Sequence, residues 1–298
     1  MTALVAGEPG ATLERAYAAC EQLARDHYEN FPVASILLPK SMRPAIAAIY
    51  AFARRADDFA DEPGYSDVDR LRLLDAWSRR LHAGVMEAPG GTSPEDLTFV
   101  ALADAIRTHR LPVPLFDDLL SAFRQDVTVK RYRTWNDVLD YCSRSANPVG
   151  RLVLRVAGYD NPALDRASDA VCTALQLTNF WQDLARDWAN GRSYVPLTDR
   201  DRAGARDADL DAGRLSPEWR DALRAVSSRT RELFEAGRPV CDGVTGRLKY
   251  ELRLTWLGGM RILDSLEHVD FDVFRQRPAL SLTDAIPLLW RAGTWRVV

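Results

Sequence analysis

The chain contains little cysteine and none of the short motifs that cysteine usually builds. Its four cysteines are Cys20, Cys142, Cys172 and Cys241, and no two are close enough for a CxxC pair. The spacing therefore indicates neither a zinc site nor a redox motif. Because cysteine is among the most buried residue types, we interpret all four as reduced core thiols of a cytoplasmic protein.

Long apolar runs and an excess of basic charge are also missing. No stretch approaches the roughly 18 apolar residues of a membrane span, and the first ten residues lack the pattern of a signal peptide. The 39 basic and 42 acidic residues give a net charge of -3, which does not indicate nucleic acid as a partner. We expect a cytoplasmic protein that meets any lipid substrate at the inner face of the membrane.

Helical periodicity dominates the sequence, and strand signals are scarce. Most apolar residues recur at spacings of three and four, which is typical of amphipathic helices. The segments 87–95 and 199–213 are expected to be loops, and composition does not change across either of them. The sequence therefore predicts a single all-α domain over residues 1–298, with about ten flexible residues at the N-terminus. Helices are expected over 11–30, 42–62, 67–85, 95–109, 114–125, 135–158, 161–190, 216–246, 248–267 and 281–291.

One expected helix carries a polar stripe that ends in two carboxylates. Tyr50, Arg54, Asp57 and Asp61 are offset by 0, 4, 7 and 11 positions. At about 100° per residue, these offsets place all four side chains within about 60° of one helix face.

A second expected helix repeats the arrangement. Gln176, Asn179, Asp183 and Asp187 are offset by 0, 3, 7 and 11 positions and fall within about 80° of one face. Carboxylates one turn apart repel each other, and a divalent cation removes that penalty. Carboxylate oxygens suit Mg²⁺, which often bridges protein carboxylates to substrate phosphates. Two matched stripes favour a Mg²⁺ cluster that binds a diphosphate, although a solvated acidic face would account for either stripe alone.

Both stripes resemble motifs of a known family. The segment YAFARRADDFADE (50–62) resembles the first aspartate-rich motif of the squalene/phytoene synthases, and QLTNFWQDLARD (176–187) resembles the second. The segment GRSYVP (191–196) is similar to the family's stretch just after the second motif, and the ordered likeness runs from about His27 to about Leu263. This resemblance implies an all-α isoprenoid-synthase bundle around a central cavity, with Mg²⁺ as cofactor and an isoprenoid diphosphate as substrate.

Three further features resemble one branch of that family, the HpnC-type enzymes of bacterial hopanoid synthesis. They are NFPVAS (30–35), YCSRSANPVG (141–150) and Trp188. The likeness implies hydroxysqualene synthase activity, in which presqualene diphosphate is ionised and water captures the rearranged cation. Transient association with other enzymes of the hopanoid pathway is part of the same expectation.

The resemblance also assigns roles to individual residues. Asp57, Asp61, Asp183 and Asp187 are the expected metal ligands and, with Tyr50 and Arg54, the expected catalytic residues. Guanidinium groups suit phosphate oxygens, so Arg54 and Arg192 are expected to hold the diphosphate. The expected substrate-binding residues are His27, Asn30, Phe31, Gln176, Asn179, Phe180, Arg192 and Tyr194. For most of these side chains, ordinary packing or an intramolecular ion pair is the competing interpretation.

Two other functions and two positions for the C-terminal tail stay open. The chain could instead condense two farnesyl diphosphates to presqualene diphosphate or squalene, or it could be a non-catalytic helical partner of a pathway enzyme. The tail LTDAIPLLWRAGTWRVV (282–298) mixes Leu, Trp and Arg. Such a composition fits peripheral contact with a membrane interface, and it also fits packing onto the bundle.

Overall fold

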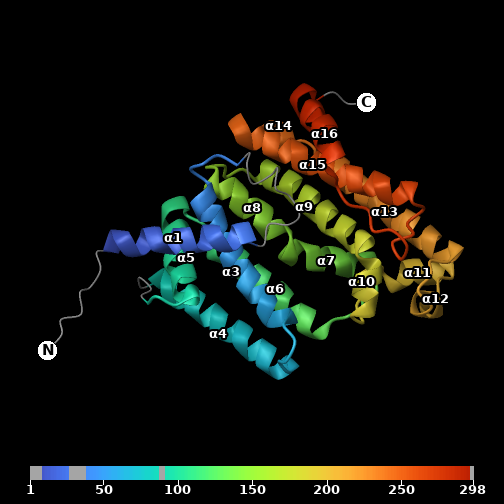
Figure 1. Cartoon of the computed structure of the whole chain (residues 1–298), viewed down its shortest axis with the longest axis horizontal. Helices are drawn as coiled ribbons and strands as arrows, with labels where there is room; N and C mark the ends of the chain where they lie inside the picture. The colour runs from blue at the N-terminus through green and yellow to red at the C-terminus, as the bar shows by residue number, and fades with distance from the viewer. Residues whose placement is uncertain (1–8, 27–37, 87–90, 296–298) are drawn as a thin grey trace. The chain divides into compact units, whose positions relative to one another are not determined.

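The computed structural model describes residues 9–26, 38–86 and 91–295, and for residues 9–11 only the backbone (Figure 1). Within these ranges the chain forms α-helices and no strand, with one isolated bridge between Arg131 and Ser193. The predicted all-α class is therefore confirmed. The chain divides into two compact units, residues 1–127 with 152–159 and residues 128–151 with 160–298. The four cysteines are free thiols, as predicted.

The first unit is built on close packing between small side chains. α1 lies against α3 and α5, and α3 also contacts α4 (Figure 1). Ala16, Cys20, Ala48 and Ala101 belong to the buried cluster between these helices. Small residues let helix backbones approach closely, which fixes the inner face of α3. The helices are α1 (Pro9–Asp26), α3 (Arg43–Asp61), α4 (Asp67–Met86), α5 (Pro94–His109) and α6 (Val113–Thr128).

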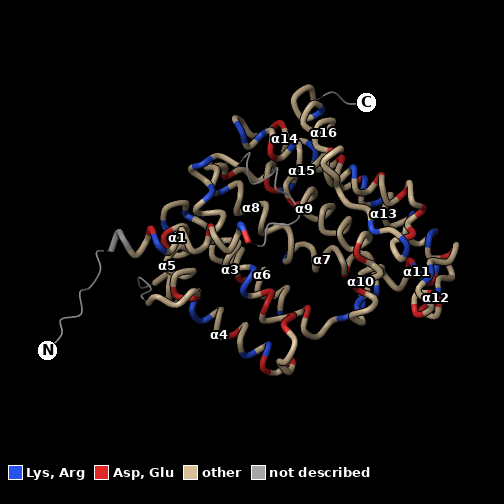
Figure 2. Tube along the Cα trace, in the orientation of Figure 1, with Lys and Arg blue, Asp and Glu red and all other residues tan. Residues whose placement is uncertain are grey.

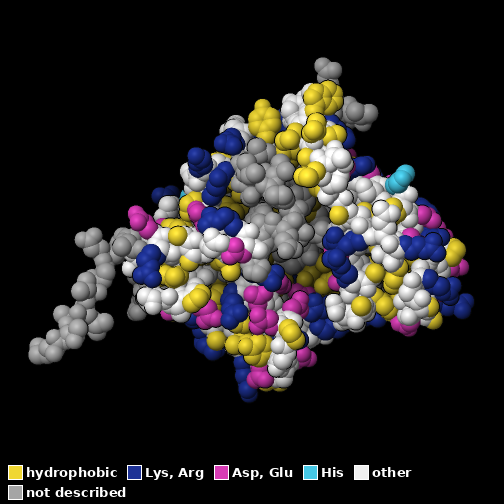
Figure 3. Space-filling view, in the orientation of Figure 1, with side chains coloured by type: hydrophobic (Ala, Val, Ile, Leu, Met, Phe, Trp, Pro, Cys, Tyr) yellow, Lys and Arg dark blue, Asp and Glu magenta, His cyan; other side chains and the backbone are white. Residues whose placement is uncertain are grey.

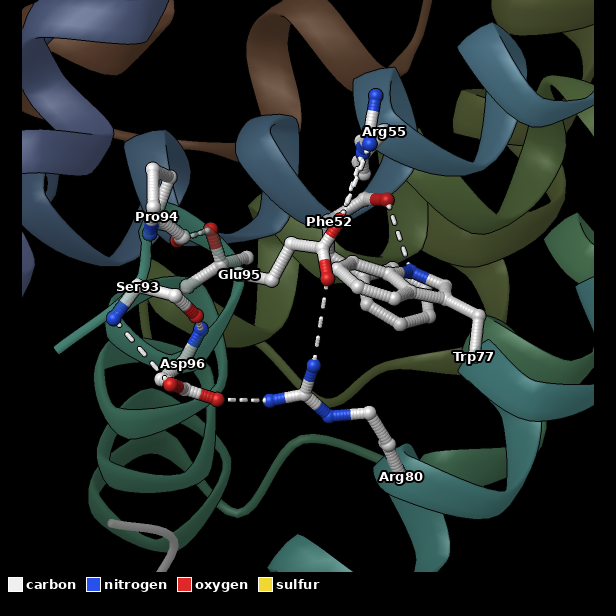
Figure 4. Close-up of polar contacts among 9 residues, drawn as sticks. Phe52, Arg55, Trp77, Arg80, Ser93, Pro94, Glu95 and Asp96 are labelled. Carbon is white, nitrogen blue, oxygen red and sulfur yellow. Dashed lines mark hydrogen bonds and ion pairs between the residues drawn. The ribbon is translucent and has the colours of Figure 1, made fainter. Parts of the chain in front are cut away.

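Polar contacts fix α3 to its neighbours (Figure 4). Trp77 donates its indole N–H to the carbonyl oxygen of Phe52 at 3.3 Å. The Arg55 guanidinium bonds Glu95 at 3.0 Å, and its carbon lies 4.6 Å from the centroid of the Phe59 ring. Arg55 therefore packs on Phe59 and links α3 to α5, whereas the adjacent Arg54 lies among the acidic residues of the stripe.

The second unit is centred on α9, which packs against α13, α15 and α7. A Cβ at Gly237 would lie 2.7 Å from the carbonyl oxygen of Ala167, so glycine permits the close approach of α13 to α9. Trp181 on α9 donates to Thr230 at 3.0 Å. The helices are α7 (Trp135–Ser145), α8 (Asn147–Val156), α9 (Pro162–Gln182), α10 (Leu184–Ala189), α11 (Leu197–Ala203), α12 (Asp207–Asp211), α13 (Pro217–Gly237), α14 (Val240–Gly243), α15 (Gly246–His268) and α16 (Leu282–Thr294). α8 begins in this unit and ends in the first.

Three of the expected long helices are divided in the structure. The segment 135–158 becomes α7 and α8 with a break at Ala146, because Pro148 lacks the N–H that would continue the helical hydrogen bonds of α7. The segment 216–246 is divided near Pro239. The segment 161–190 is interrupted at Asp183, which caps both α9 and α10 with φ -100° and ψ 9°.

The expected loop over 199–213 was wrong, because α11 and α12 form there. Its low apolar content is offset by ion pairs, both within the segment and with α13. Asp199 is buried and accepts a bond from Arg229 at 2.6 Å, and the buried Arg200 pairs with Asp207. Of the other expected loop, 87–90 lie outside the described residues, and α5 begins at Pro94. No helix of the described ranges combines the length and the apolar character that crossing a bilayer demands.

Candidate active site

The first carboxylate stripe lies on α3, as the periodicity predicted. α3 is one continuous helix through Asp61, so Tyr50, Arg54, Asp57 and Asp61 keep the expected spacing. Tyr50, Arg54 and Asp57 are half-buried, and Asp61 is exposed. Figure 2 shows basic residues followed by acidic residues along this end of α3. The opposite face buries Phe52, Ala56 and Phe59, so packing orients the stripe away from the core of the unit.

Arg54 neutralises this stripe from within the same helix. Its Nη2 lies 2.9 Å from Oδ1 of Asp58, and its Nη1 lies 3.9 Å from Oδ2 of Asp57. Among the described residues, its Nε has no hydrogen-bond partner. The guanidinium therefore pairs with two aspartates of its own helix, and its buried Nε stays unpaired within the part of the chain that the structure describes.

Tyr50 lies one turn before Arg54. Burial raises the pKa of its phenol, Arg54 lowers it, and Asp57 and Asp58 raise it. The side chain is therefore a neutral hydroxyl at physiological pH, able to donate a hydrogen bond to an anion.

The second stripe crosses the break between α9 and α10. The backbone N–H of Asp183 still bonds to Asn179, and that of Asp187 to Asp183, at 2.8 and 2.9 Å. The stripe thus follows a slightly bent helical path. Gln176, Asp183 and Asp187 are half-buried, and Asn179 is exposed.

A residue that the sequence interpretation missed neutralises Asp183. Arg277, from the segment between α15 and α16, forms a two-pronged contact with its carboxylate. Nε lies 2.6 Å from Oδ1, and Nη2 lies 3.0 Å from Oδ2. Arg186 lies 3.6 Å from Oδ1. Asp183 raises the pKa of Arg277, mainly through this hydrogen bond. No local sequence pattern connects residues 94 positions apart, so only the tertiary fold reveals the pair.

The segment after α10 is held in a defined turn. Gly191 adopts φ 74°, and the backbone N–H of Arg192 returns to the carbonyl oxygen of Asp187 at 2.8 Å. The N–H of Ser193 bonds to the carbonyl oxygen of Lys130 at 3.0 Å. Arg192 and the acidic end of α10 are therefore kept close together by the backbone.

Aromatic rings gather beside this turn. Phe180 and Tyr194 are stacked with centroids 3.6 Å apart and ring planes 1° apart. Tyr132 lies 5.5 Å from Tyr194, and Tyr141 lies 6.1 Å from Phe180. Three of these rings are less than 9% exposed, and Tyr194 is 9% exposed. The structure thus joins the predicted residues Phe180 and Tyr194 and adds Tyr132 and Tyr141.

Some of the predicted residues cannot be placed. His27, Asn30 and Phe31 lie outside the described residues.

Trp188, which supported the branch assignment, donates to Asp211 at 2.9 Å and stacks under the Arg131 guanidinium. This contact ties α10 to α12.

The two stripes belong to different units, so their approach across a shared cavity stays a prediction. Within the described ranges, no three His, Cys, Asp or Glu side chains form a group able to hold a metal ion. A pocket of about 380 Å³ in the first unit is lined by Glu14, Tyr17, Glu21 and His109, among others. It contains none of the predicted site residues.

This all-α architecture, with an aspartate-rich stripe on α3 and another across α9 and α10, is typical of synthases that use prenyl diphosphates. Residues 24–284 match the family described as "Squalene/phytoene synthase". The chain belongs to that family and is an enzyme of this prenyl diphosphate-using class.

Individual relatives narrow the comparison. The chain is 39% identical over 210 residues to a hydroxysqualene synthase of Zymomonas mobilis, covering 70% of this chain and 68% of the relative. It is 37% identical over 244 residues to a hydroxysqualene synthase of Rhodopseudomonas palustris, covering 81% and 80%. The crystal structure of squalene synthase HpnC from Alicyclobacillus acidocaldarius aligns with a TM-score of 0.80 and 39% identity, covering 88% of this chain and 96% of that one.

Proposed function

We propose that this chain is a hydroxysqualene synthase of hopanoid or squalene biosynthesis. The substrate is presqualene diphosphate, whose carbon–oxygen bond breaks to release diphosphate. The carbocation rearranges, and a water molecule adds its oxygen to the cation and loses a proton. The products are hydroxysqualene, diphosphate and a proton. The observation that carries this proposal is the identity of 37–39% to two relatives that are both named for this activity.

Mg²⁺ is the proposed cofactor, and the donor set fits it. Asp57, Asp61, Asp183 and Asp187 offer hard carboxylate oxygens, which Mg²⁺ prefers. Each stripe already engages an arginine, so the carboxylates of both accept a positively charged partner. The four aspartates would hold the metal, which when bound stabilises the charge that develops on the leaving diphosphate.

The protein's own cations and dipoles act on the same anion. Arg54 and Arg192 would bind the diphosphate oxygens, because guanidinium donors match phosphate geometry. Tyr50 and Tyr194 would donate hydroxyl hydrogen bonds, and Gln176 and Asn179 would offer amide groups. His27, Asn30 and Phe31 complete the proposed substrate contacts. Arg277 neutralises Asp183 when no other cation is bound, which keeps that half-buried carboxylate paired.

Aromatic walls suit a carbocation, because the face of an aromatic ring attracts positive charge without reacting as a base. Phe180 and Tyr194 form a stiff stacked pair next to the acidic end of α9. Tyr141 and Tyr132 extend this aromatic surface. We propose that these rings face the hydrocarbon part of the substrate in the cytoplasmic enzyme.

The deciding experiment is a product assay. Purified protein with Mg²⁺ is incubated separately with presqualene diphosphate and with farnesyl diphosphate, and the lipids are analysed. We expect hydroxysqualene from presqualene diphosphate and no turnover of farnesyl diphosphate alone. Formation of presqualene diphosphate or squalene from farnesyl diphosphate would instead establish the condensing activity.

A non-catalytic role in support of another pathway enzyme is tested with the double variant Asp57→Asn with Asp183→Asn. This variant should lose all turnover of presqualene diphosphate, whereas a helical partner protein would keep its supporting function.

A further inference from the structure

The last described helix exposes large apolar side chains to solvent. On α16, Leu282 is 90% exposed, Ile286 76%, Leu289 46% and Trp290 69%. We name these four residues the α16 apolar face. In Figure 3, hydrophobic side chains gather over this helix. Exposed apolar patches that are rimmed by polar residues mark interaction sites.

The four side chains lie on one side of the helix. At about 100° per residue, they fall within an arc of about 100°. The two charged residues of the helix lie outside that arc, and Asp284 pairs with Arg261 on α15 at 3.0 Å. The inner side buries Ala292, which is 2% exposed. α16 therefore carries apolar side chains on its outer face as well as on its inner face.

α16 is fixed in place, so its outer face is not a consequence of loose packing. A capping box between Ser281 and Asp284 begins the helix. Near its end, Arg253 donates to the carbonyl oxygen of Ala292 at 3.1 Å. Trp295 then donates to Asp242 at 3.0 Å and contacts Trp256 edge to face.

Positive charge lies at the C-terminal end of α16. Residues 238–253 include four cations, which we name the cationic edge: Arg238, Arg247, Lys249 and Arg253. The acids in this stretch are Asp242, which pairs with Arg253 and Lys249, and Glu251, which is buried. Burial raises the pKa of Glu251 to about 8, so it adds little negative charge at neutral pH.

Aromatic residues join the two features. Tyr250 is 46% exposed, and the Arg253 guanidinium lies 5.9 Å from its ring and 4.8 Å from that of Trp295. Tryptophan and tyrosine beside cations, next to exposed leucine and isoleucine, is the combination that binds at a lipid headgroup boundary.

The size of the patch decides between occupants. Four side chains at these exposures offer on the order of 500 Å². A stable interface with a second copy would bury about 800 Å² on each partner. A bilayer has no such threshold, and anionic headgroups complement the cationic edge. We propose that the α16 apolar face and the cationic edge dock the enzyme on the surface of an anionic lipid bilayer.

The test is co-sedimentation of the full chain with vesicles of phosphatidylcholine alone or mixed with phosphatidylglycerol. We expect binding that is stronger to the anionic vesicles. Ile286→Ser with Trp290→Ser should weaken binding on the order of 100-fold, about tenfold for each apolar side chain. Arg247→Gln with Lys249→Gln should weaken binding to the anionic vesicles about fivefold per charge and remove the preference for them.

A matched control separates docking from general stickiness. Met86 is 88% exposed at the end of α4, outside the patch, so Met86→Ser should bind vesicles like the wild type. Circular dichroism and the melting temperature establish that each variant is folded, and quenching of tryptophan fluorescence by brominated lipid that is reduced in Trp290→Phe reports insertion of Trp290.

Three results would overturn the proposal. They are no vesicle binding by the wild type, binding that the α16 variants leave unchanged, and dimerisation in solution that depends on Ile286 and Trp290 without lipid binding. Because the assay measures binding and not turnover, its outcome does not depend on the proposed reaction.

Discussion

The two carboxylate stripes differ in the origin of their counter-cations. On α3, Arg54 pairs with Asp58, four residues further along the same helix, at 2.9 Å. At the end of α9, the partner of Asp183 is Arg277, 94 residues further along the chain. The first stripe therefore carries its electrostatic balance in its local sequence, whereas the second obtains it only after the chain has folded.

The Arg54–Asp58 and Arg277–Asp183 pairs also differ in contact geometry and in exposure. Arg54 makes one close contact, and the side chains of Arg54 and Asp58 are 38% and 23% exposed. Arg277 makes two parallel contacts, and the side chains of Arg277 and Asp183 are 29% and 26% exposed. Two-pronged guanidinium–carboxylate pairs are stronger and more specific than single contacts. We therefore expect the two ion pairs to contribute differently to the free energy of unfolding. Because both stripes supply carboxylates to the proposed metal site, we expect them to contribute alike to catalysis.

The largest expected effect tests their likeness in catalysis. Asp57→Asn and Asp183→Asn each keep the shape of the side chain and remove its charge. Each should lower kcat/KM on the order of 10² to 10³-fold, the usual result of removing one electrostatic contact to a transition state. The measurement is product formation at saturating Mg²⁺.

Asp140→Asn is the control, because Asp140 is 68% exposed in an ordinary surface pair with Arg144. Its activity should equal that of the wild type. A large loss in only one of the two stripe variants would mean that the stripes do not share a function.

Glu251 extends the comparison of carboxylates, because within the described residues it is buried and forms no ion pair with an arginine. It is 6% exposed, and within the described chain its Oε2 has no hydrogen-bond partner. Burial raises its pKa from the ordinary 4.5 to about 8. Between these values the unfolded chain releases the proton and the folded chain keeps it. The contribution of Glu251 to the free energy of unfolding therefore falls as pH rises from 4.5 to 8 and changes no further above that.

Glu251→Gln should remove this dependence. At about pH 8.5 the variant should be more stable than the wild type by about 2 kcal/mol or more, and at about pH 4.5 the two should be nearly equal. Urea unfolding at both pH values provides the measurement. An equal difference at both pH values would show that packing, and not ionisation, distinguishes the two side chains.

The same contrast explains what the sequence could predict. The α3 stripe could be predicted in full, because Tyr50, Arg54, Asp57 and Asp61 lie on one uninterrupted helix whose period determines their face. The second stripe was predicted in composition but not in shape, since the break at Asp183 has no proline or glycine to announce it. Arg277 and the ring of Tyr132 reach the site through tertiary contacts, which periodicity does not encode.

Removing each counter-cation tests the difference in stability. Arg277→Gln leaves a half-buried carboxylate with one weaker partner, so without metal it should cost about 1–2 kcal/mol of unfolding free energy. Arg54→Gln should cost about 0.5 kcal/mol or less, because its pair is more exposed and local. Urea unfolding in EDTA measures both. Titration calorimetry should also show tighter Mg²⁺ binding by Arg277→Gln, since the guanidinium no longer competes for Asp183. If the two variants lost equal free energy of unfolding, the two ion pairs would not differ in their contribution to stability.

A smaller expected effect concerns the turn after the second stripe. Gly191 has φ 74° and Gly158, at the end of α8, has φ 83°, and a Cβ on either would meet nothing within 4 Å. Alanine at each site should therefore cost about 1 kcal/mol through backbone strain alone. Only Gly191→Ala should also raise the KM for presqualene diphosphate, because strain there displaces Arg192 and Tyr194. Thermal melts and initial rates on the two variants separate these effects. If both variants kept the wild-type KM, the turn would be a structural connection and not part of the binding surface.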